Sequence, residues 1–307
     1  MALRSVKLPP ADINLPSNLH AMSLMMVSTV SRSALHATIR HASAGMHAFE
    51  LLFFQNFVGL FFMLPWIVRY GFAPLRTTRL KLQLLRVIIT VVSASMLFHA
   101  LSITPLARVA ALTFLVPIFT TVLAIFFLGE TVRLRRWLAI LFGFAGTFVV
   151  VRPGIDAVDL GSLLTIGSSI IFSFALLLTK IISRTDSSVT ITCYSVMLMT
   201  PMSLAAAIFV WHWPEPHQII WLIAIGVLST GSQLIGTQAL KEGDMNVLLP
   251  LDFFKLIWSS VIGYVFFSEI PSIYTWIGGA MIFASATYIA FRESKFGRAN
   301  AVQTATK

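Results

Sequence analysis

Three residues that can do chemistry follow one another at intervals of three in an otherwise apolar stretch: Asp252, Lys255 and Trp258. Residues three apart on a helix are neighbours, so the carboxylate and the ammonium group can pair, and the indole lies one turn further on. A charge near the middle of a membrane costs at least about 2.5–3.5 kcal/mol, so it must face a partner or a polar pathway. Two interpretations stay open: a structural ion pair between helices, or a binding site for a solute or a proton.

A polar stripe runs along an earlier segment, where Ser28, Arg32 and His36 recur at intervals of four and therefore share one helix face. Such a stripe must face inward, where it either lines a solute pathway or satisfies its own members. His99 is a further candidate because imidazole titrates near neutral pH and can move protons. A hydrogen-bonded structural role is the other interpretation of His99.

Four uncharged amides also lie in apolar segments: Gln55, Asn56, Gln233 and Gln238. Amides that bond across helices stabilise their packing by about 0.6 kcal/mol on average. The same groups can hold a polar cargo without requiring charge. Both interpretations are kept for each of them.

Another set of residues indicates bends and turns. Pro117 removes a backbone hydrogen bond in the middle of an apolar segment, which predicts a hinge or a plain kink. Glu130, after Gly129, and Glu269 each come shortly before an apolar segment. Because acidic residues near a helix N-terminus stabilise it by about 0.3–1 kcal/mol, we expect both glutamates to form turns.

The elements that carry these residues must lie in lipid. The 307 residues are 57% hydrophobic and 11% charged, with a mean hydropathy of +0.85, whereas a soluble domain is about 25% charged. A single cysteine excludes an internal disulfide framework. About 20 apolar residues span a bilayer as a helix, so we expect an all-α membrane protein with ten transmembrane helices. The ten segments are 19–39, 48–68, 82–103, 106–128, 135–151, 160–182, 189–210, 217–240, 246–268 and 274–291.

Positive charge predicts how these segments are oriented. With the N-terminus in the cytoplasm, 16 of the 22 Lys and Arg residues lie on the cytoplasmic side, three lie outside, and three (Arg32, Arg86 and Lys255) lie within segments. This bias follows the positive-inside rule, so we expect both termini to be cytoplasmic. It also accounts for the net charge of +10 without a nucleic-acid partner. Residues 1–18 and 293–307 are expected to be a flexible cytoplasmic N-terminus and tail.

The chain also contains a faint copy of itself. Residues 100–152 and 239–291 align without a gap at an offset of 139, and 11 of the 53 positions are identical, among them Glu130/Glu269 and Phe114/Phe253. Five segments in each half is an odd number, so the second half enters the membrane from the opposite side. Inverted repeats of this kind provide two related states, one open to each side.

Residues 101–154 carry a resemblance to a known family. Residues 101–154, which read LSITPLARVAALTFLVPIFTTVLAIFFLGETVRLRRWLAILFGFAGTFVVVRPG, resemble the end of an EamA repeat of the drug/metabolite transporter superfamily. The shared features are an Ala-rich start, Phe and Pro in mid-segment, Gly-Glu, a basic turn, Trp, and Gly-x-x-Gly. The resemblance covers two repeats, 19–152 and 153–292. Residues 47–71 are similar to bacterial members that take up S-adenosylmethionine.

The resemblance implies a secondary transporter in the bacterial inner membrane that moves a small organic metabolite by alternating access. Amino acids come first among the cargoes, then S-adenosylmethionine and riboflavin. We expect no enzyme activity, no cofactor and no metal, because the chain has no ATP-binding motif and no nucleophile–base set. An intramembrane enzyme and an assembly protein are the alternatives, although an assembly protein does not need a lysine at mid-membrane. Small-molecule substrate and lipid are the expected partners; proton coupling and a monomeric or homodimeric state stay open.

Overall fold

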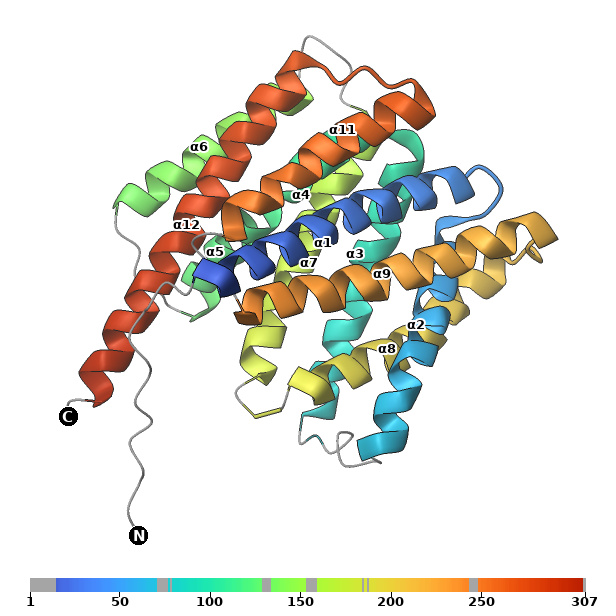
Figure 1. Cartoon of the computed structure of the whole chain (residues 1–307), viewed down its shortest axis with the longest axis horizontal. Helices are drawn as coiled ribbons and strands as arrows, with labels where there is room; N and C mark the ends of the chain where they lie inside the picture. The colour runs from blue at the N-terminus through green and yellow to red at the C-terminus, as the bar shows by residue number, and fades with distance from the viewer. Residues whose placement is uncertain are drawn as a thin grey trace.

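The computed structural model describes residues 15–70, 77, 79–128, 134–152, 159–183, 185–186, 188–242 and 248–305, and their regular elements are all helical (Figure 1). The elements are α1 (Leu15–Ala42), α2 (Ala48–Tyr70), α3 (Leu80–Ile103), α4 (Leu106–Thr113), α5 (Leu115–Leu128), α6 (Leu134–Val151), α7 (Leu160–Ile182), α8 (Ser188–Ala207), the 3-10 helix η2 (Ile208–Val210), α9 (Pro216–Glu242), the 3-10 helix η3 (Leu249–Phe253), α11 (Phe254–Phe267) and α12 (Ile273–Ala305).

Each predicted apolar segment corresponds to one helix or to two consecutive ones. Within the described residues, six stretches are long and apolar enough to cross a membrane, and α2, α6 and α12 contain shorter apolar stretches. The remaining helix, α1, carries the polar stripe of Ser28, Arg32 and His36, which lowers its apolar character. The all-helical prediction is therefore confirmed.

The ends of the chain differ from the expected boundaries. The first helix already begins at Leu15. At the other end, α12 continues to Ala305, well beyond the expected start of a flexible tail at residue 293. No proline interrupts that stretch, so the helix continues past its apolar part. Gly129 and Glu130 lie outside the described residues.

Both repeats interrupt a helix at the same place. Helix α4 ends before Phe114, three residues ahead of Pro117. Pro117 has no N–H for the Thr113 carbonyl, and its ring crowds that carbonyl, which explains the interruption. In the second half, η3 gives way to α11 after Phe253, the repeat equivalent of Phe114. There the proline is Pro250, in the first turn of η3, so two different prolines accompany one shared interruption.

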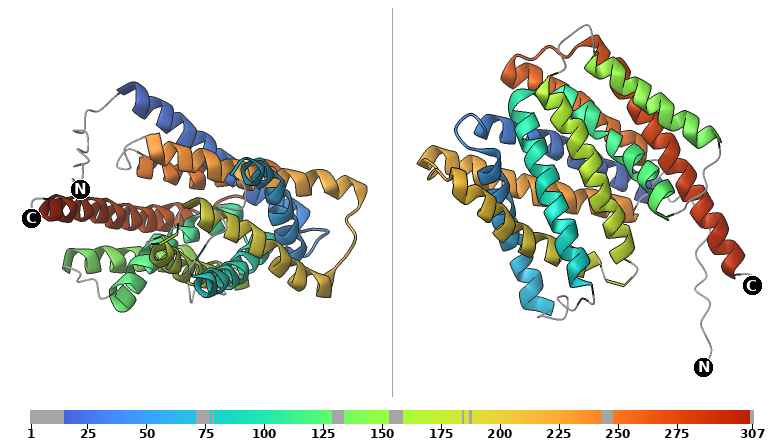
Figure 2. Two further views of the ribbon diagram at one scale, coloured as in Figure 1. Left: turned by 90° about the horizontal axis from the view of Figure 1, so that it is seen from below. Right: turned by 180° about the vertical axis from the view of Figure 1, so that it is seen from behind.

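The helix packing follows the repeat. The offset of 139 makes α7 the equivalent of α1, and α9 the equivalent of α3. Helix α1 packs along α9, and α7 packs along α3, which is the same contact with the halves exchanged. Likewise α11 packs on α1 and α5 on α7, while α6 packs against its own equivalent α12. Figure 1 shows the α1–α9 and α6–α12 pairs, and Figure 2 shows α3 beside α7 from behind.

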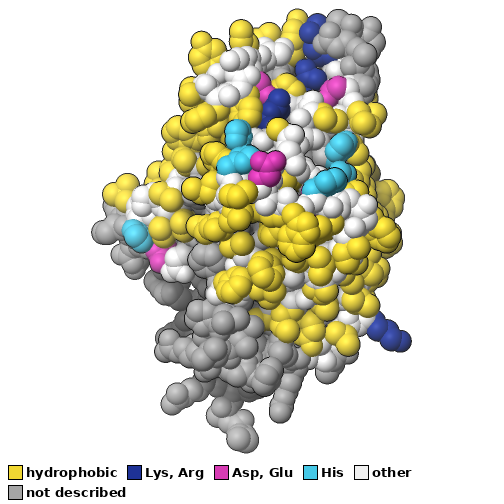
Figure 3. Space-filling model, turned by 90° about the vertical axis from the view of Figure 1, so that its right-hand side faces the viewer, with side chains coloured by type: hydrophobic (Ala, Val, Ile, Leu, Met, Phe, Trp, Pro, Cys, Tyr) yellow, Lys and Arg dark blue, Asp and Glu magenta, His cyan; other side chains and the backbone are white. Residues whose placement is uncertain are grey.

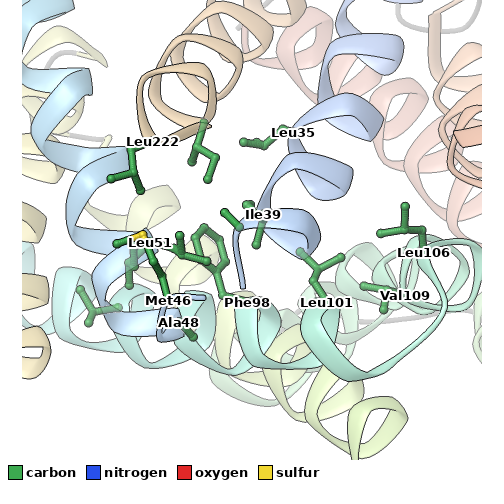
Figure 4. Packing of buried hydrophobic residues seen from close by; sticks show 14 of the residues in the cluster. Leu35, Ile39, Met46, Ala48, Leu51, Phe98, Leu101, Leu106, Val109 and Leu222 are labelled. Carbon is green, nitrogen blue, oxygen red and sulfur yellow. The ribbon is translucent and has the colours of Figure 1, made fainter. Parts of the chain in front are cut away.

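Close packing inside the bundle relies on large apolar side chains in one place and on glycines in another. One cluster joins α1, α2, α3, α4 and α9 through residues such as Ile39, Leu51 and Phe98 (Figure 4). Between α6 and α12, a Cβ at Gly146 would lie 2.8 Å from the Gly278 carbonyl, and one at Gly278 would lie 2.5 Å from the Gly146 carbonyl. In a membrane, such small residues let helix backbones touch.

Candidate functional site

Lys255 lies in the first turn of α11, directly after the helix interruption. Its side chain is 8% exposed, and its Nζ lies 4.5 Å from the centroid of the Phe114 ring. A cation within about 6 Å of an aromatic face is attracted to it by about 0.5–2 kcal/mol, with the larger values at desolvated sites. The lysine therefore reaches from the interruption of the second half to the interruption of the first.

Three phenylalanine rings surround this meeting point. The rings of Phe114 and Phe253 lie nearly parallel, at an interplanar angle of 22° and a centroid distance of 6.2 Å. Phe283 of α12 contacts both, at 5.3 Å from Phe114 and 4.9 Å from Phe253. These rings were not among the predicted site residues, although the identity of Phe114 and Phe253 across the repeat could have indicated them. We call these three residues the aromatic cluster.

Asp252 belongs to the 3-10 helix η3 and Lys255 to α11, which follows it directly. Because residues three apart also share a face in a 3-10 helix, the change of helix type leaves the predicted closeness of the two side chains in place. Among the described residues, no ion pair within 4.0 Å joins the two. Asp252 and Arg32 are the charged groups that act electrostatically on Lys255.

The polar stripe of α1 holds this helix between α9 and α11. Ser28 Oγ donates to the Ser232 carbonyl of α9 at 2.9 Å. On the α11 side, Ser33 Oγ donates to the Lys255 carbonyl at 3.1 Å and accepts from Ser259 Oγ at 3.2 Å. In the sequence, the only indication of this role of Ser33 was its position beside the polar stripe. Arg32 lies between these contacts with an exposed side chain, and its guanidinium lies beside Gly236 of α9.

Three predicted residues hold buried polar atoms that have no hydrogen-bond partner among the described residues: His36 Nδ1, Gln55 Oε1 and Trp258 Nε1. Buried polar atoms are nearly always hydrogen-bonded, so each of these atoms is a candidate contact for water or for a bound molecule. Arg32 and His36 lie on α1, and Lys255 and Trp258 lie on α11, which packs against it. That the four side chains meet in one site stays a prediction.

No described contact brings the other candidates to Lys255. Asn56 Nδ2 donates to the Leu52 carbonyl of its own helix at 2.8 Å. Gln238 bonds to Glu242, also within its own helix, and Gln233 is exposed on the same helix. His99 and Pro117 are exposed, His99 near the end of α3 and Pro117 on α5. Their proposed roles stay predictions.

One end of the bundle joins the two halves through charged side chains. Arg40 Nη2 lies 2.6 Å from Glu269 Oε1, and Arg40 also donates to the Thr104 carbonyl. Glu269 Oε2 accepts the N–H of Leu106, the first residue of α4, at 2.9 Å. The glutamate predicted to form a turn ahead of α12 thus places its carboxylate at the N-terminus of α4. We call this side of the molecule the Glu269 end.

A second ion pair lies at the same end. Arg108 Nη1 and Asp159 Oδ1 are 2.9 Å apart, and Asp159 also accepts hydrogen bonds from Thr104 Oγ1 and from the backbone and side chain of Ser162. Burial alone would raise the pKa of Asp159, but the hydrogen bonds from Ser162 and Thr104 and the charge of Arg108 outweigh it and hold the pKa below its usual 3.8. Thr104 connects the two pairs. Figure 3 shows acidic, basic and histidine side chains gathered on this side of the molecule.

The opposite end is joined differently. His20 Nε2 and Glu242 Oε2 lie 3.5 Å apart, and the His20 side chain is 64% exposed. Arg86 is buried and donates to Ser195 Oγ at 2.7 Å and to the Ile191 carbonyl at 3.1 Å, which ties α3 to α8. The only indication of this role in the sequence was a single arginine within an apolar segment.

The chain is similar to known proteins that are named as transporters. A model of the EamA-like transporter family matches residues 19–152 and 159–291. The S-adenosylmethionine uptake transporter of Rickettsia bellii is 27% identical over 88% of this chain and 93% of its own length. The riboflavin transporter of Vibrio cholerae is 29% identical over 89% of this chain and 94% of its own. A solved crystal structure covering 89% of this chain, at 18% identity, has a TM-score of 0.58 and shares the fold.

Proposed function

Since the chain belongs to the EamA-like transporter family, we propose that it is a secondary transporter that moves a small heteroaromatic or amino-acid-like metabolite across the bacterial inner membrane. Membership makes it a multi-pass membrane transporter rather than an enzyme. Its relatives named for S-adenosylmethionine and riboflavin support a heteroaromatic cargo, since both compounds carry flat nitrogen-containing rings.

The observation that carries this proposal is the buried Lys255 at the meeting point of the two helix interruptions. Interrupted helices near mid-membrane are typical of transporter binding sites, because the interruption leaves backbone groups for a substrate. Lys255 belongs to one half and contacts Phe114 of the other. A cargo bound there touches both halves, and its binding free energy then depends on how the halves are arranged.

The topology that we propose has ten spans in two inverted halves, with both termini in the cytoplasm. The matching helix contacts of the two halves support it, because the contacts of α1 with α9, of α1 with α11 and of α2 with α9 recur, with the halves exchanged, as those of α7 with α3, of α7 with α5 and of α8 with α3. The distribution of Lys and Arg along the sequence supports it independently. In this topology the Glu269 end faces the outside of the cell.

Alternating access requires one end to be held shut while the other is open. At the Glu269 end, Arg40–Glu269 and Arg108–Asp159 both join residues of different halves at 2.6 and 2.9 Å. At the opposite end, the described ion pair between halves is longer, at 3.5 Å, and its histidine is exposed. We therefore infer that this structure is the state closed at the Glu269 end, and that opening this end separates both pairs.

Uptake into proteoliposomes tests the function. We expect labelled S-adenosylmethionine, riboflavin or an amino acid to enter vesicles that contain the purified protein, and Lys255→Ala to reduce uptake at least about tenfold, which corresponds to about 1.4 kcal/mol. Lys81→Ala is the matched control, because Lys81 is exposed near the start of α3. If no compound of a broad metabolite panel moves, the transporter proposal fails. An unchanged rate in Lys255→Ala removes only the proposed site.

A further inference from the structure

Resting on the transport function proposed above, we propose that the cargo carries an acidic group, a carboxylate or a phosphate, which binds between Lys255 and Arg32. The inference names a property of the substrate that membership of the family leaves open. It follows from the balance of charge and of hydrogen-bond donors between α1 and α11.

The charges around Lys255 do not cancel. Arg32 directly precedes Ser33, whose hydroxyl donates to the Lys255 carbonyl at 3.1 Å, and Asp252 lies three residues before Lys255, so two cations and one carboxylate lie close together along α1, η3 and α11. Neither Lys255 nor Arg32 forms an ion pair within 4.0 Å in the described part of the chain. An unpaired charge in an apolar region is costly, and the ring of Phe114 attracts the ammonium group without neutralising it. One negative charge is missing from the site.

The hydrogen-bonding groups point to the same chemistry. Ammonium, guanidinium and indole N–H groups are donors and cannot accept. The indole N–H of Trp258 is buried without a partner, one helical turn after Lys255 on α11. A carboxylate or phosphate supplies several acceptor oxygens to such a donor set, and charge-assisted hydrogen bonds are about twice as strong as neutral ones. A neutral cargo leaves these donors partly unpaired.

The structure also explains what holds Lys255 in position before an acidic group binds. Ser33 of α1 bonds to the Lys255 carbonyl and fixes the backbone of α11 against α1. The ammonium group lies 4.5 Å from the centroid of the Phe114 ring, and a charge-assisted hydrogen bond to an anion can replace this attraction. Arg32, with its exposed side chain, is the cation that an entering cargo can reach.

Matched ligand pairs that differ by one acidic group provide the test. We name tryptophan and tryptamine, and flavin mononucleotide and riboflavin. Binding of each compound to the purified full chain is measured by ligand-dependent thermal unfolding, since a ligand that binds the folded state raises its melting temperature. We expect the acidic member of at least one pair to bind at least about tenfold more tightly than its partner, and we expect the same preference in competition for uptake.

Variants then assign the preference to the site. Lys255→Gln is expected to remove the preference for the acidic member, and Lys255→Arg is expected to retain it because the positive charge remains. Trp258→Phe keeps an aromatic ring but removes the N–H donor, so we expect a loss of about three- to tenfold in affinity for the acidic member. Trp213→Phe is its control, because Trp213 is 83% exposed.

Two results overturn the inference. One is equal or tighter binding of the member that lacks the acidic group in every pair that binds. The other is an unchanged preference in a Lys255→Gln protein that still unfolds cooperatively. In both cases uptake by the wild-type protein continues, so the transport proposal stands. If no compound binds and none moves, the transport proposal itself fails, and the inference fails with it.

Discussion

At the scale of single residues, Thr104 connects two cross-half ion pairs although it carries no charge. Its carbonyl accepts from Arg40, and its hydroxyl donates to Asp159. Thr104 directly follows α3 and is fully buried, so both of its polar groups need partners inside the protein. The Glu269 end is therefore one hydrogen-bonded unit, and a change in either pair is transmitted to the other through a single residue.

Asp159 predicts how this unit responds to pH. Its pKa is held below the usual 3.8 in the folded protein, so its contribution to stability is present above that value and is lost as the pH falls through the lower, folded-state pKa. We expect the melting-temperature difference between wild type and Asp159→Asn to be constant from about pH 5 to 8 and to shrink below about pH 4. Thermal unfolding across this pH range measures it.

Glu215→Gln is the matched control for Asp159→Asn, because its side chain is 70% exposed. Its unfolding should match the wild type at every pH. A difference between wild type and Asp159→Asn that already declines between pH 7 and 5 would contradict the assigned ion pair.

Single residues also mark the limit of what the sequence predicts. Lys255, Arg32, His36 and Trp258 were selected because polar side chains in apolar segments are expensive, and the structure places them on two helices that pack together, α1 and α11. The Asp252–Lys255 pairing was inferred from helical spacing, but these two described residues form no ion pair within 4.0 Å. Long-range partners, such as Phe114 for Lys255, depend on tertiary packing that spacing alone does not contain.

At the scale of elements, the long apolar helices were predictable because the thickness of the bilayer sets their length, independently of the details of packing. The interruption near Phe114 follows from Pro117, a local effect. The interruption before Phe254 was not predicted, because Pro250 lies near the start of its segment, where proline is normally tolerated. The repeat alignment with Phe114 was the missing signal.

Pro117→Ala tests whether the interrupted helix matters for function. Alanine restores an N–H donor for the Thr113 carbonyl, so we expect α4 and α5 to join and the ring of Phe114 to leave Lys255. Interior proline costs about 3 kcal/mol, so the variant should melt at the same or a higher temperature while uptake falls severalfold. Thermal unfolding and proteoliposome uptake of the same preparation provide both readings.

Pro201→Ala is the control for this prediction. Pro201 also lies inside a helix, but α8 runs unbroken from Ser188 to Ala207. We expect its uptake to equal that of the wild type. A loss of uptake in Pro201→Ala as large as in Pro117→Ala would mean that proline removal acts generally and not through the interruption.

At the scale of the whole molecule, surface chemistry agrees with a lipid environment. Large apolar side chains are exposed on several helices, for example Phe126 at 71% and Phe127 at 66% on α5. Figure 3, which views the molecule from the Glu269 end, shows charged and histidine side chains among the apolar ones there. Water at the ends of the bundle and lipid around its sides account for this distribution.

Cysteine labelling tests the proposed orientation. In a Cys193→Ser background, we place single cysteines by Ala44→Cys, between α1 and α2, and by Ser183→Cys, directly after α7; both positions are exposed. A membrane-impermeant maleimide is expected to label Cys at position 44 in intact cells and to label position 183 only after permeabilisation. The reverse pattern would invert the topology, and labelling of both positions in intact cells would contradict the span count.

The stacked rings of Phe114 and Phe253 have a consequence for motion. Because the two residues are repeat equivalents, exchanging the conformations of the halves maps their contact onto itself. The Arg40–Glu269 contact joins residues that are not repeat equivalents, so exchanging the halves gives a contact between two other residues, at the opposite end of the molecule. In the proposed transport cycle, contacts between equivalent residues or helices, including that of α6 with α12, can persist in both states. The ammonium group of Lys255 lies against one of these contacts, 4.5 Å from the Phe114 ring, so we expect it to move little relative to that ring during the cycle.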